Sequence, residues 1–308
     1  MNKIGPCVLI TLFIASCGYN ADQPYSDTPT SGKVNIAADE TLVPLAKAQM
    51  DTFHGLYHYA AIHIDYKSES ALFKALIDDS AKVIMATRNL NAEESNYFKS
   101  RNLIPSVVKI AFDAIAIIIN KDNADSLLKV NQLKMILQGK INTWKELNVK
   151  STLGKISFVF DQNGSSTVRY IKDSLMDGLQ FPSNCFAANS NEDVIAYVEK
   201  HSNAIGVIGV SWISDNDDSA SKGFLSRIKV ASIGQESALS ADDYYKPYQA
   251  YISLRQYPFI RDVYMINREG RAGLGTGFVS FVAGDQGQRI VRLMGMLPAT
   301  MPVRIVKI

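Results

Sequence analysis

Hydroxyl side chains stand in the first turns of three predicted helices, and each of these helices follows a predicted strand. They are Thr41, Ser70 and the run Ser165, Ser166 and Thr167. The unpaired backbone N–H groups at a helix start, together with the positive end of the helix dipole, favour an anion. A hydroxyl at such a position more commonly caps its own helix. Three such segments at the carboxyl ends of strands, where α/β sheets bind ligands, favour an anion site.

Alternating strands and helices must position these side chains. From Lys33 onward, short apolar segments alternate with helical periodicity, which is typical of an α/β protein. The predicted strands cover 34–38, 62–66, 82–86, 156–160, 204–210, 262–266 and 302–308. Residues 107–120 are almost entirely apolar and too long for one simple strand, so we interpret them as a segment that crosses between two lobes. An acidic, solvated loop is expected over 214–223.

The N-terminus has the pattern of a secretion signal. Lys3 precedes an apolar run that is too short to span a bilayer as a helix, and small residues follow. The sequence IASC at 14–17 resembles a bacterial lipobox, which predicts a signal peptide over 1–16 and lipidation of Cys17. An ordinary signal peptide cleaved elsewhere and a buried N-terminal strand are the alternatives. Two or more acyl chains anchor a protein stably, and the polar residues 17–32 would form a flexible tether.

The composition excludes several classes of protein. The 308 residues are 47% hydrophobic and 20% charged, which indicates a globular chain rather than a disordered one. The 32 basic and 30 acidic residues leave a formal net charge of +2, and no dense run of Lys and Arg indicates binding to nucleic acid. Three cysteines exclude a disulfide scaffold. We therefore expect a globular protein that meets a membrane only through its lipid anchor.

Several motifs occur in the same order as in a known family. The segment LQGKINTW at 137–144 is similar to the family pattern F-x-G-K-I-x-x-W and is the most specific match. The other matches lie at 41–45, 85–88, 111–116 with Asn120, 164–167, 204–209, 257–261, 287–288 and 297–298. From about Lys33 to the C-terminus, the chain resembles the phosphate-binding lipoproteins and periplasmic proteins of the phosphate ABC transporter, which belong to the two-lobed substrate-binding proteins.

The resemblance implies a two-lobed α/β fold of the periplasmic-binding-protein type, in which each lobe is a mixed sheet flanked by helices and the ligand cleft lies between the lobes. Lobe I would comprise residues 33–112 and 256–308, and lobe II residues 113–255. The chain would be a monomeric solute-binding protein of the bacterial cell envelope, without catalytic residues, cofactor or metal. It would bind phosphate or a related small oxyanion and pass it to an ABC permease. Transferred by motif position, the family's ligand contacts fall on Thr41, Ser70, Arg88, Ser165, Ser166 and Thr167.

Acidic residues beside these motifs depart from the family pattern. Asp161 stands where the family has an arginine, and it joins the candidate ligand contacts because a carboxylate can accept a hydrogen bond from a protonated phosphate. Asp39, Glu40 and Glu69 stand where the family commonly has Gly and Ser. An unpaired carboxylate against a buried dianion is costly unless a cation or a proton intervenes. The candidate compensating cations are Arg88 and Arg169.

Three other interpretations remain open. A sensor or interaction lipoprotein could use the same fold for a different small polar ligand, and the acidic substitutions motivate this alternative. A hydrolase of phosphate esters, with Asp161 or Glu69 as acid–base, lacks a nucleophile–base pair and a set of metal ligands in the sequence. His54 and His58, four residues apart, could share a metal on one helix face, but their apolar neighbours favour packing.

Overall fold

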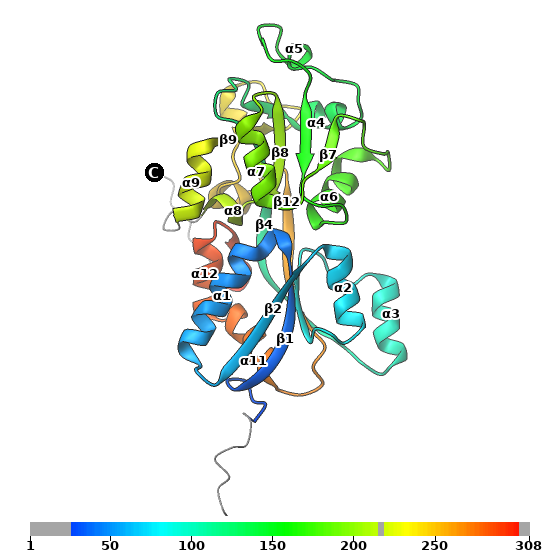
Figure 1. The fold of residues 1–308 in the computed structure, drawn as a ribbon, viewed down its shortest axis with the longest axis vertical. Helices are drawn as coiled ribbons and strands as arrows, with labels where there is room; N and C mark the ends of the chain where they lie inside the picture. Colours follow the sequence, from blue (N-terminus) through cyan, green and yellow to red (C-terminus); the bar gives the residue numbers. More distant parts are fainter. Residues whose placement is uncertain (1–25, 215–218, 302–308) are drawn as a thin grey trace, which may run out of the picture.

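A computed structural model describes residues 26–214 and 219–301. The molecule is elongated, with two halves along its long axis and strands that run through its middle (Figure 1). A ten-stranded sheet extends through both halves. Its main path follows the order β2 (Ala60–Lys67), β1 (Gly32–Asp39), β3 (Val83–Ala86), β12 (Ile260–Asn267), β4 (Ser106–Asn120), β8 (Ala204–Gly209), β6 (Ser157–Phe160) and β7 (Cys185–Ala187). Two short strands also pair with β4, namely β9 (Ile228–Val230) and β13 (Leu297–Pro298).

The first half consists of the N-terminal strands and the returning β12. β1 pairs in parallel with β2 and β3, whereas β12 pairs antiparallel with β3 and β4. Parallel neighbours require crossover connections, and two helices supply them, α1 (Val43–Leu56) and α2 (Glu69–Ile77). The other helices of this half are α3 (Ala92–Ser100), α11 (Leu274–Ala283) and α12 (Asp285–Leu293). Both faces of the sheet are covered, because Ile36 of β1 packs in the core cluster of α1 and α11 while its neighbour Ala37 packs in that of α2 and α3.

One strand, β4, runs through both halves. Its residues 106–114 pair with β12, and its residues 115–119 pair with β8. The interpretation of 107–120 as too long for one strand is therefore wrong. Fifteen residues form a single strand because different neighbours satisfy the backbone of its two parts. The expected lobe boundary between residues 112 and 113 falls inside this strand.

The second half surrounds the C-terminal part of β4, with β8 and β6 between β4 and β7. Its helices are α4 (Val130–Leu137), α5 (Trp144–Leu147), α6 (Ser166–Ile171), the π-helical η2 (Lys172–Met176), α7 (Asn191–Lys200), α8 (Ser211–Ser214) and α9 (Ser219–Arg227). A small separate sheet contains β5 (Leu127–Lys129), β10 (Ser232–Gly234) and β11 (Tyr244–Tyr245), followed by α10 (Gln249–Ser253). The most specific sequence motif ends in Trp144, which is fully buried and donates its indole N–H to the Asn203 carbonyl at 2.9 Å.

The end of the predicted tether belongs to the folded body. Asp27 accepts a hydrogen bond from the backbone N of Leu274 at 2.9 Å and forms an ion pair with Arg271 at 2.7 Å. Residues 26–31 are therefore docked against the start of α11, where a carboxylate is favoured by the free N–H groups of the helix. The prediction of a flexible tether over 17–32 is wrong for this last part.

Three further predictions concern residues that the structure does not describe. The predicted signal peptide over 1–16, the lipidation of Cys17 and the predicted strand over 302–308 lie outside the described residues. The acidic loop expected over 214–223 is wrong at residue 214, which ends α8, and from residue 219 onward, where α9 begins.

Three strands of the sheet end at the junction between the halves and position the candidate site. β1 ends at Asp39 and leads through the short helix η1 (Glu40–Leu42) into α1. β2 leads into α2, and β6 leads through 161–165 into α6. Gly164 in this last connection has a φ of +82°, a left-handed conformation that suits glycine.

Gly206 in β8 provides a test of how tightly the second half is packed. A Cβ at this position would lie 2.7 Å from Cγ2 of Val198 and 2.9 Å from Cγ1 of both Ile118 and Val194. We expect Gly206→Ala to lower the free energy of unfolding by about 1–3 kcal/mol, because overpacking forces the neighbours to shift. Chemical denaturation measures this loss. The control is Gly223→Ala in α9, where nothing lies within 4 Å, and equal losses in the two variants would contradict the packing.

Candidate functional site

The two halves meet at a buried cluster of Asp39, Thr41 and Ser166. Asp39 and Thr41 come from the end of β1 and from η1, and Ser166 begins α6 in the other half. Asp39 Oδ1 accepts three hydrogen bonds, from the Thr41 backbone N at 2.9 Å, Thr41 Oγ1 at 2.6 Å and Ser166 Oγ at 3.0 Å. The two hydroxyl oxygens are 3.2 Å apart. The fold thus brings together two residues that the sequence predicts as ligand contacts.

Arg261 on β12 lies behind the two hydroxyl groups. Its Nη2 donates to Thr41 Oγ1 at 2.8 Å and its Nη1 to Ser166 Oγ at 2.9 Å. Its Nε donates to Asp113 Oδ2 at 2.8 Å, and the side chains of Arg261 and Asp113 are only 2% and 0% exposed. Each hydroxyl therefore accepts a hydrogen bond from the guanidinium and donates one to Asp39. The positively charged guanidinium therefore contacts Asp39 indirectly, through these two hydroxyl groups.

Neither Arg261 nor Asp113 is among the residues predicted for the site, although both lie in matched motifs. The available signal was a pair of charged residues in each of two strands that are otherwise largely apolar, Lys109 and Asp113 in β4 and Arg261 and Asp262 in β12. The two residues are register partners in the antiparallel pair of β4 and β12. A buried charge in a strand needs a partner of opposite charge, but the sequence does not say which strands are neighbours.

Asp161 and Ser165 form a second buried pair at the start of α6. Ser165 Oγ donates to Asp161 Oδ1 at 2.5 Å and accepts from the backbone N of Val168 at 3.1 Å, so this hydroxyl also caps its own helix. Several buried oxygens at the junction have no hydrogen-bond partner within the described part of the chain. They are Asp39 Oδ2, Asp113 Oδ1, Asp161 Oδ2 and Thr167 Oγ1.

The buried carboxyl groups outnumber the buried guanidinium of Arg261. Burial, reinforced by the nearby charge of Asp39, raises the pKa of Asp161 to about 7, although the Ser165 hydrogen bond opposes the shift. Burial also raises the pKa values of Asp39 and Asp113, and the charge of Arg261 opposes both shifts. A proton on Asp161 near neutral pH reduces the excess of negative charge at the junction.

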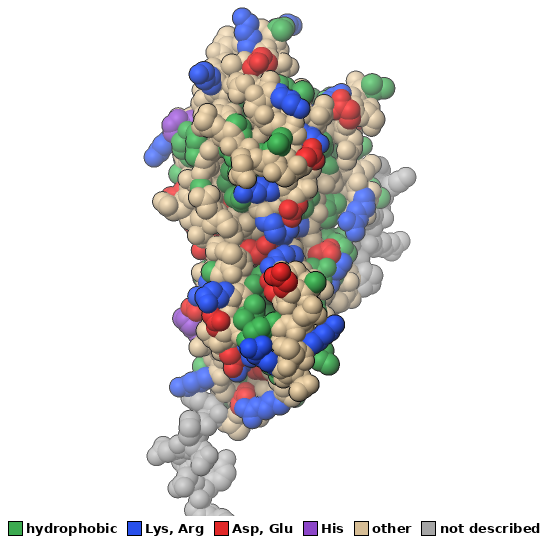
Figure 2. Space-filling model, turned by 90° about the vertical axis from the view of Figure 1, so that its right-hand side faces the viewer, with side chains coloured by type: hydrophobic (Ala, Val, Ile, Leu, Met, Phe, Trp, Pro, Cys, Tyr) green, Lys and Arg blue, Asp and Glu red, His purple; other side chains and the backbone are tan. Residues whose placement is uncertain are grey.

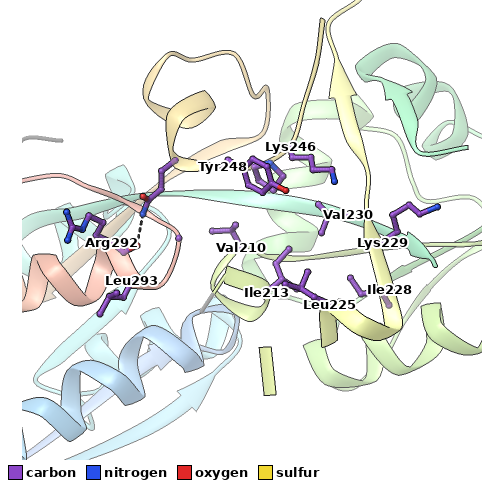
Figure 3. A pocket seen from close by; sticks show the side chains of 13 residues that line it. Val210, Ile213, Leu225, Ile228, Lys229, Val230, Lys246, Tyr248, Arg292 and Leu293 are labelled. Carbon is purple, nitrogen blue, oxygen red and sulfur yellow. Dashed lines mark hydrogen bonds between the residues drawn. The ribbon is translucent and has the colours of Figure 1, made fainter. Parts of the chain in front are cut away.

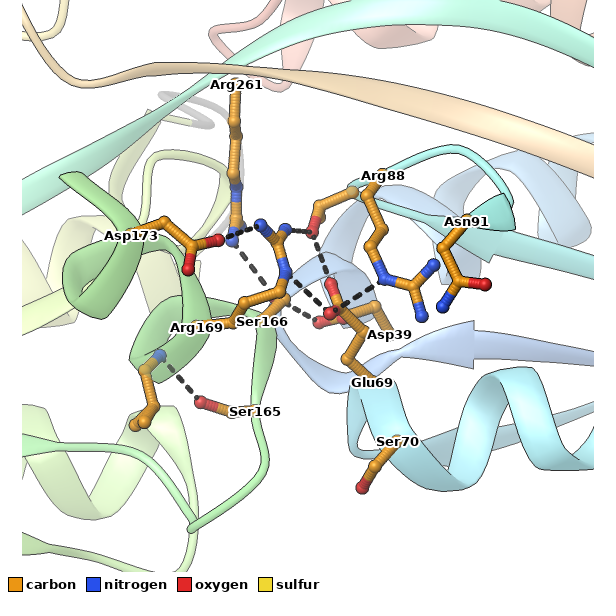
Figure 4. A network of polar contacts seen from close by, with 12 residues as sticks. Asp39, Glu69, Ser70, Arg88, Asn91, Ser165, Ser166, Arg169, Asp173 and Arg261 are labelled. Carbon is orange, nitrogen blue, oxygen red and sulfur yellow. Dashed lines mark hydrogen bonds and ion pairs between the residues drawn. The ribbon is translucent and has the colours of Figure 1, made fainter. Parts of the chain in front are cut away.

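Glu69 at the start of α2 forms a second contact between the halves (Figure 4). Its Oε1 pairs with Nε of Arg169 from α6 at 2.6 Å and with Nε of Arg88 at 3.2 Å. Its Oε2 accepts a hydrogen bond from Thr87 Oγ1 at 3.2 Å. The guanidinium of Arg88 also donates to both carboxylate oxygens of Glu94 at 2.8 Å. The two candidate compensating cations therefore contact Glu69 and Glu94 rather than the carboxyl groups of the buried cluster.

The remaining predicted contacts lie at different distances from this cluster. Thr167 is buried next to Ser166, whereas Ser70 is exposed and its Oγ lies 3.4 Å from that of Ser68. Figure 4 shows Ser70 apart from the network of contacts. Figure 2 shows acidic and basic side chains gathered at the narrow middle of the molecule. The junction thus unites Thr41, Asp161 and the 165–167 segment, while Ser70 and Arg88 make other contacts.

The junction carries the chemistry of hydrogen-bond donors rather than of metal ligands. Within residues 26–214 and 219–301, no group of three or more His, Cys, Asp and Glu side chains could hold a metal ion. His54, one of the two histidines considered for a metal, accepts a hydrogen bond from the backbone N of Ile62 at Nε2. No helix in the described part of the chain has both the length and the apolarity needed to cross a membrane.

Known proteins match most of the chain. A family model described as the PBP superfamily domain matches residues 23–286. The chain is 24% identical over 288 residues to the phosphate-binding protein PstS of Staphylococcus saprophyticus, which covers 90% of this chain and 83% of that protein. The PstS of Staphylococcus aureus is 23% identical over 286 residues, with coverage of 90% and 82%.

Solved structures share the fold. A structure with bound phosphate, described as a phosphate ABC transporter substrate-binding protein from Clostridium perfringens, has a TM-score of 0.73 at 23% identity and covers 87% of this chain and 100% of its own. An ABC-type phosphate transport receptor from Vibrio cholerae has a TM-score of 0.63 at 19% identity, with coverage of 87% and 100%. The expected two-lobed α/β fold is confirmed. All four are described as binding proteins or transport receptors.

The pKa of Asp161 predicts a pH dependence of stability. Its ordinary value of 3.8 rises to about 7 in the folded protein, so the folded state holds this proton more tightly than the unfolded chain does. The stabilisation by the proton is complete below the unfolded pKa and is lost as the pH rises through the folded one. We expect Asp161→Asn to flatten this dependence and to raise the free energy of unfolding above neutral pH by about 2–4 kcal/mol.

Denaturation of both proteins from about pH 5 to about pH 8 measures the effect. Asp122→Asn, which changes an exposed carboxylate in a turn, is the control and should follow the wild type. Parallel pH profiles for the wild type and Asp161→Asn would show that this carboxyl group does not hold its proton in the folded state.

Proposed function

This chain belongs to the PBP superfamily, and on that premise we propose that it is a lipid-anchored, extracytoplasmic solute-binding protein that captures phosphate or a related small oxyanion for an ABC permease. Its similarity to two PstS proteins and to a structure with bound phosphate supports phosphate as the first ligand to test. The lipobox pattern at 14–17 supports the anchor and the location in the bacterial cell envelope.

The observation that carries the proposal is the convergence of donors from both halves on one carboxylate oxygen. Asp39 Oδ1 accepts from the N–H and hydroxyl of Thr41 and from the hydroxyl of Ser166, with Arg261 behind both hydroxyl groups. A carboxylate oxygen and a phosphate oxygen are both anionic acceptors and take the same kind of charge-assisted hydrogen bond. The site therefore holds, within its own chain, the chemical equivalent of part of an oxyanion.

Asp39 also sets a condition on the ligand. An ionised phosphate beside an ionised, buried Asp39 would place like charges together in a medium of low polarity. The ligand can therefore bind if the Asp39 side chain moves away from the donors, or if a proton lies on Asp39 or on the phosphate. Either requirement lowers the affinity below what the donor set alone would provide.

The proposed lobes are residues 33–112 with 256–308 and residues 113–255. Closure would bend the chain at β4 and at the segment that leads into β12, since these connect the two halves. Thr41 and Ser166 lie on opposite sides of that hinge, so a ligand held by both would favour closure.

Calorimetric titration of the ligand-stripped protein with phosphate tests the proposed ligand. We expect the wild type to bind and Asp39→Ala to bind about tenfold more tightly, because the substitution frees three donors and removes a negative charge beside the ligand. Asp65→Ala, which removes an exposed carboxylate from β2, is the matched control and should leave the affinity unchanged. Absence of heat and of a thermal shift at millimolar phosphate, in the wild type and in Asp39→Ala, would reject phosphate.

Cys17 tests the anchor independently of the ligand. We expect Cys17→Ala to move the protein from the detergent-rich to the aqueous phase on detergent partitioning, because the acyl chains supply the membrane affinity. Cys185→Ala is the control, since its thiol is partly buried and burial raises its pKa to about 12, which makes it unreactive. A Cys17→Ala protein that stays in the detergent phase would contradict lipidation at this residue.

The second candidate function is a sensor or interaction lipoprotein with a different small polar ligand. The observation that favours it is the excess of buried carboxyl groups over guanidinium at the junction. The same titration separates the two functions. A protein that binds no phosphate but folds normally would support the second candidate. A strain that lacks this protein and shows a phenotype that does not depend on the permease would also support it.

A further inference from the structure

A second concave site lies beside the junction, lined by residues of both halves (Figure 3). It is a pocket of about 890 Å³, within the size range of sites for small molecules. Ile213 of α8, Leu225 of α9 and Ile228 of β9 line it from the second half, and Arg292 and Leu293 of α12 line it from the first half.

The pocket has an apolar floor and a cationic rim. Its floor includes Val210, Ile213, Leu225, Ile228 and Val230. Tyr248, which also lines the pocket, is 57% exposed. The charged lining residues are Lys229, Lys246 and Arg292, and none of the described residues that line the pocket is Asp or Glu.

Within residues 26–214 and 219–301 none of the three cations forms an ion pair, and Lys229 is the one that is engaged by a carbonyl oxygen. Lys229 donates its Nζ to the Asn123 carbonyl at 2.7 Å. Lys246 and Arg292 make no ion pair with any residue in the described ranges. The backbone beneath Arg292 is fixed, because Gln249 Nε2 donates to the carbonyls of Arg292 at 2.6 Å and Met296 at 2.9 Å.

We propose that this pocket binds a small amphipathic anion, a molecule with an apolar ring or chain and one anionic group. The apolar body would cover the aliphatic floor, and the anionic group would reach Lys246 and Arg292. Burial of apolar surface supplies affinity, and the cations select the sign of the charge. A purely apolar ligand would leave the cations unused, and a cationic one would be repelled.

The helix α8 connects this pocket to the donor cluster. Ile213 and the preceding Val210 line the pocket. Between them, Ser211 Oγ and Trp212 Nε1 donate to the Thr41 carbonyl at 3.3 Å and 3.0 Å. A ligand that shifts α8 would therefore shift Thr41, so the two sites would be coupled. This coupling, unlike the pocket itself, rests on the proposed function.

Anilinonaphthalene sulfonate is a suitable probe, because it is an amphipathic anion whose fluorescence rises when it leaves water. We expect saturable binding to the native wild type. The double variant Lys246→Gln/Arg292→Gln should bind about fivefold to tenfold more weakly, the loss expected for two solvent-exposed ion pairs. Lys145→Gln/Lys150→Gln, which removes the same charge from exposed positions of the second half, should bind as the wild type does.

Leu225→Gln tests the apolar floor separately. Leu225 is 40% exposed, so the substitution should leave the fold intact while weakening the probe severalfold. Equal affinities of the wild type, the rim variant and Leu225→Gln would overturn the pocket as the binding site, because the probe would then bind elsewhere.

Repeating the titration with saturating phosphate tests the coupling. Linkage requires that phosphate change the probe's dissociation constant if the sites are coupled, and we expect a change of at least about twofold. An unchanged constant in a protein that does bind phosphate would overturn the coupling. If calorimetry shows no phosphate binding at all, the proposed function fails, and the titrations of the rim and floor variants still decide the pocket.

Discussion

The guanidinium of Arg261 is the one buried cation among Asp39, Asp113 and Asp161 within the described residues, and both halves depend on it. Ions taken out of water regain the lost hydration only through close, well-aligned partners. Arg261 has three of them, a carboxylate on β4 and a hydroxyl from each half. One side chain therefore links β12 and β4 to the two loops that meet at the junction.

The same constraint explains why this junction differs from a simple oxyanion site. Asp161 adds a buried carboxyl group before α6, and the buried cation of the junction is Arg261 on β12, which contacts the hydroxyl groups of Thr41 and Ser166. Arg88 and Arg169 are engaged by acidic partners. Any anion that enters must compete with Asp39 for the donors. Selectivity would then depend on protonation as well as on shape.

Local patterns in the sequence predicted much of this arrangement, and long-range pairing limited the rest. Thr41 and Ser166 were predictable because a hydroxyl after a strand and before a helix is a local pattern. Arg261 and Asp113 were not, because 148 positions separate them and only the register of β4 with β12 joins them. The continuity of β4 was misjudged for the same reason. A strand of this length can be predicted only when the strands that pair with each of its parts are known. Asp39 was recognised as a departure, but its capture of the donors depends on tertiary geometry.

The docking of Asp27 against α11 has a mechanical consequence. The contacts of Asp27 with Leu274 and Arg271 fix the first described residues against the start of α11. Figure 1 places these residues at the end of the first half that is remote from the junction. A pull on the chain before residue 26 therefore acts on the folded body at the first half. If the N-terminus is held at a surface, the first half is the part that is held, and any movement between the halves would displace the second half.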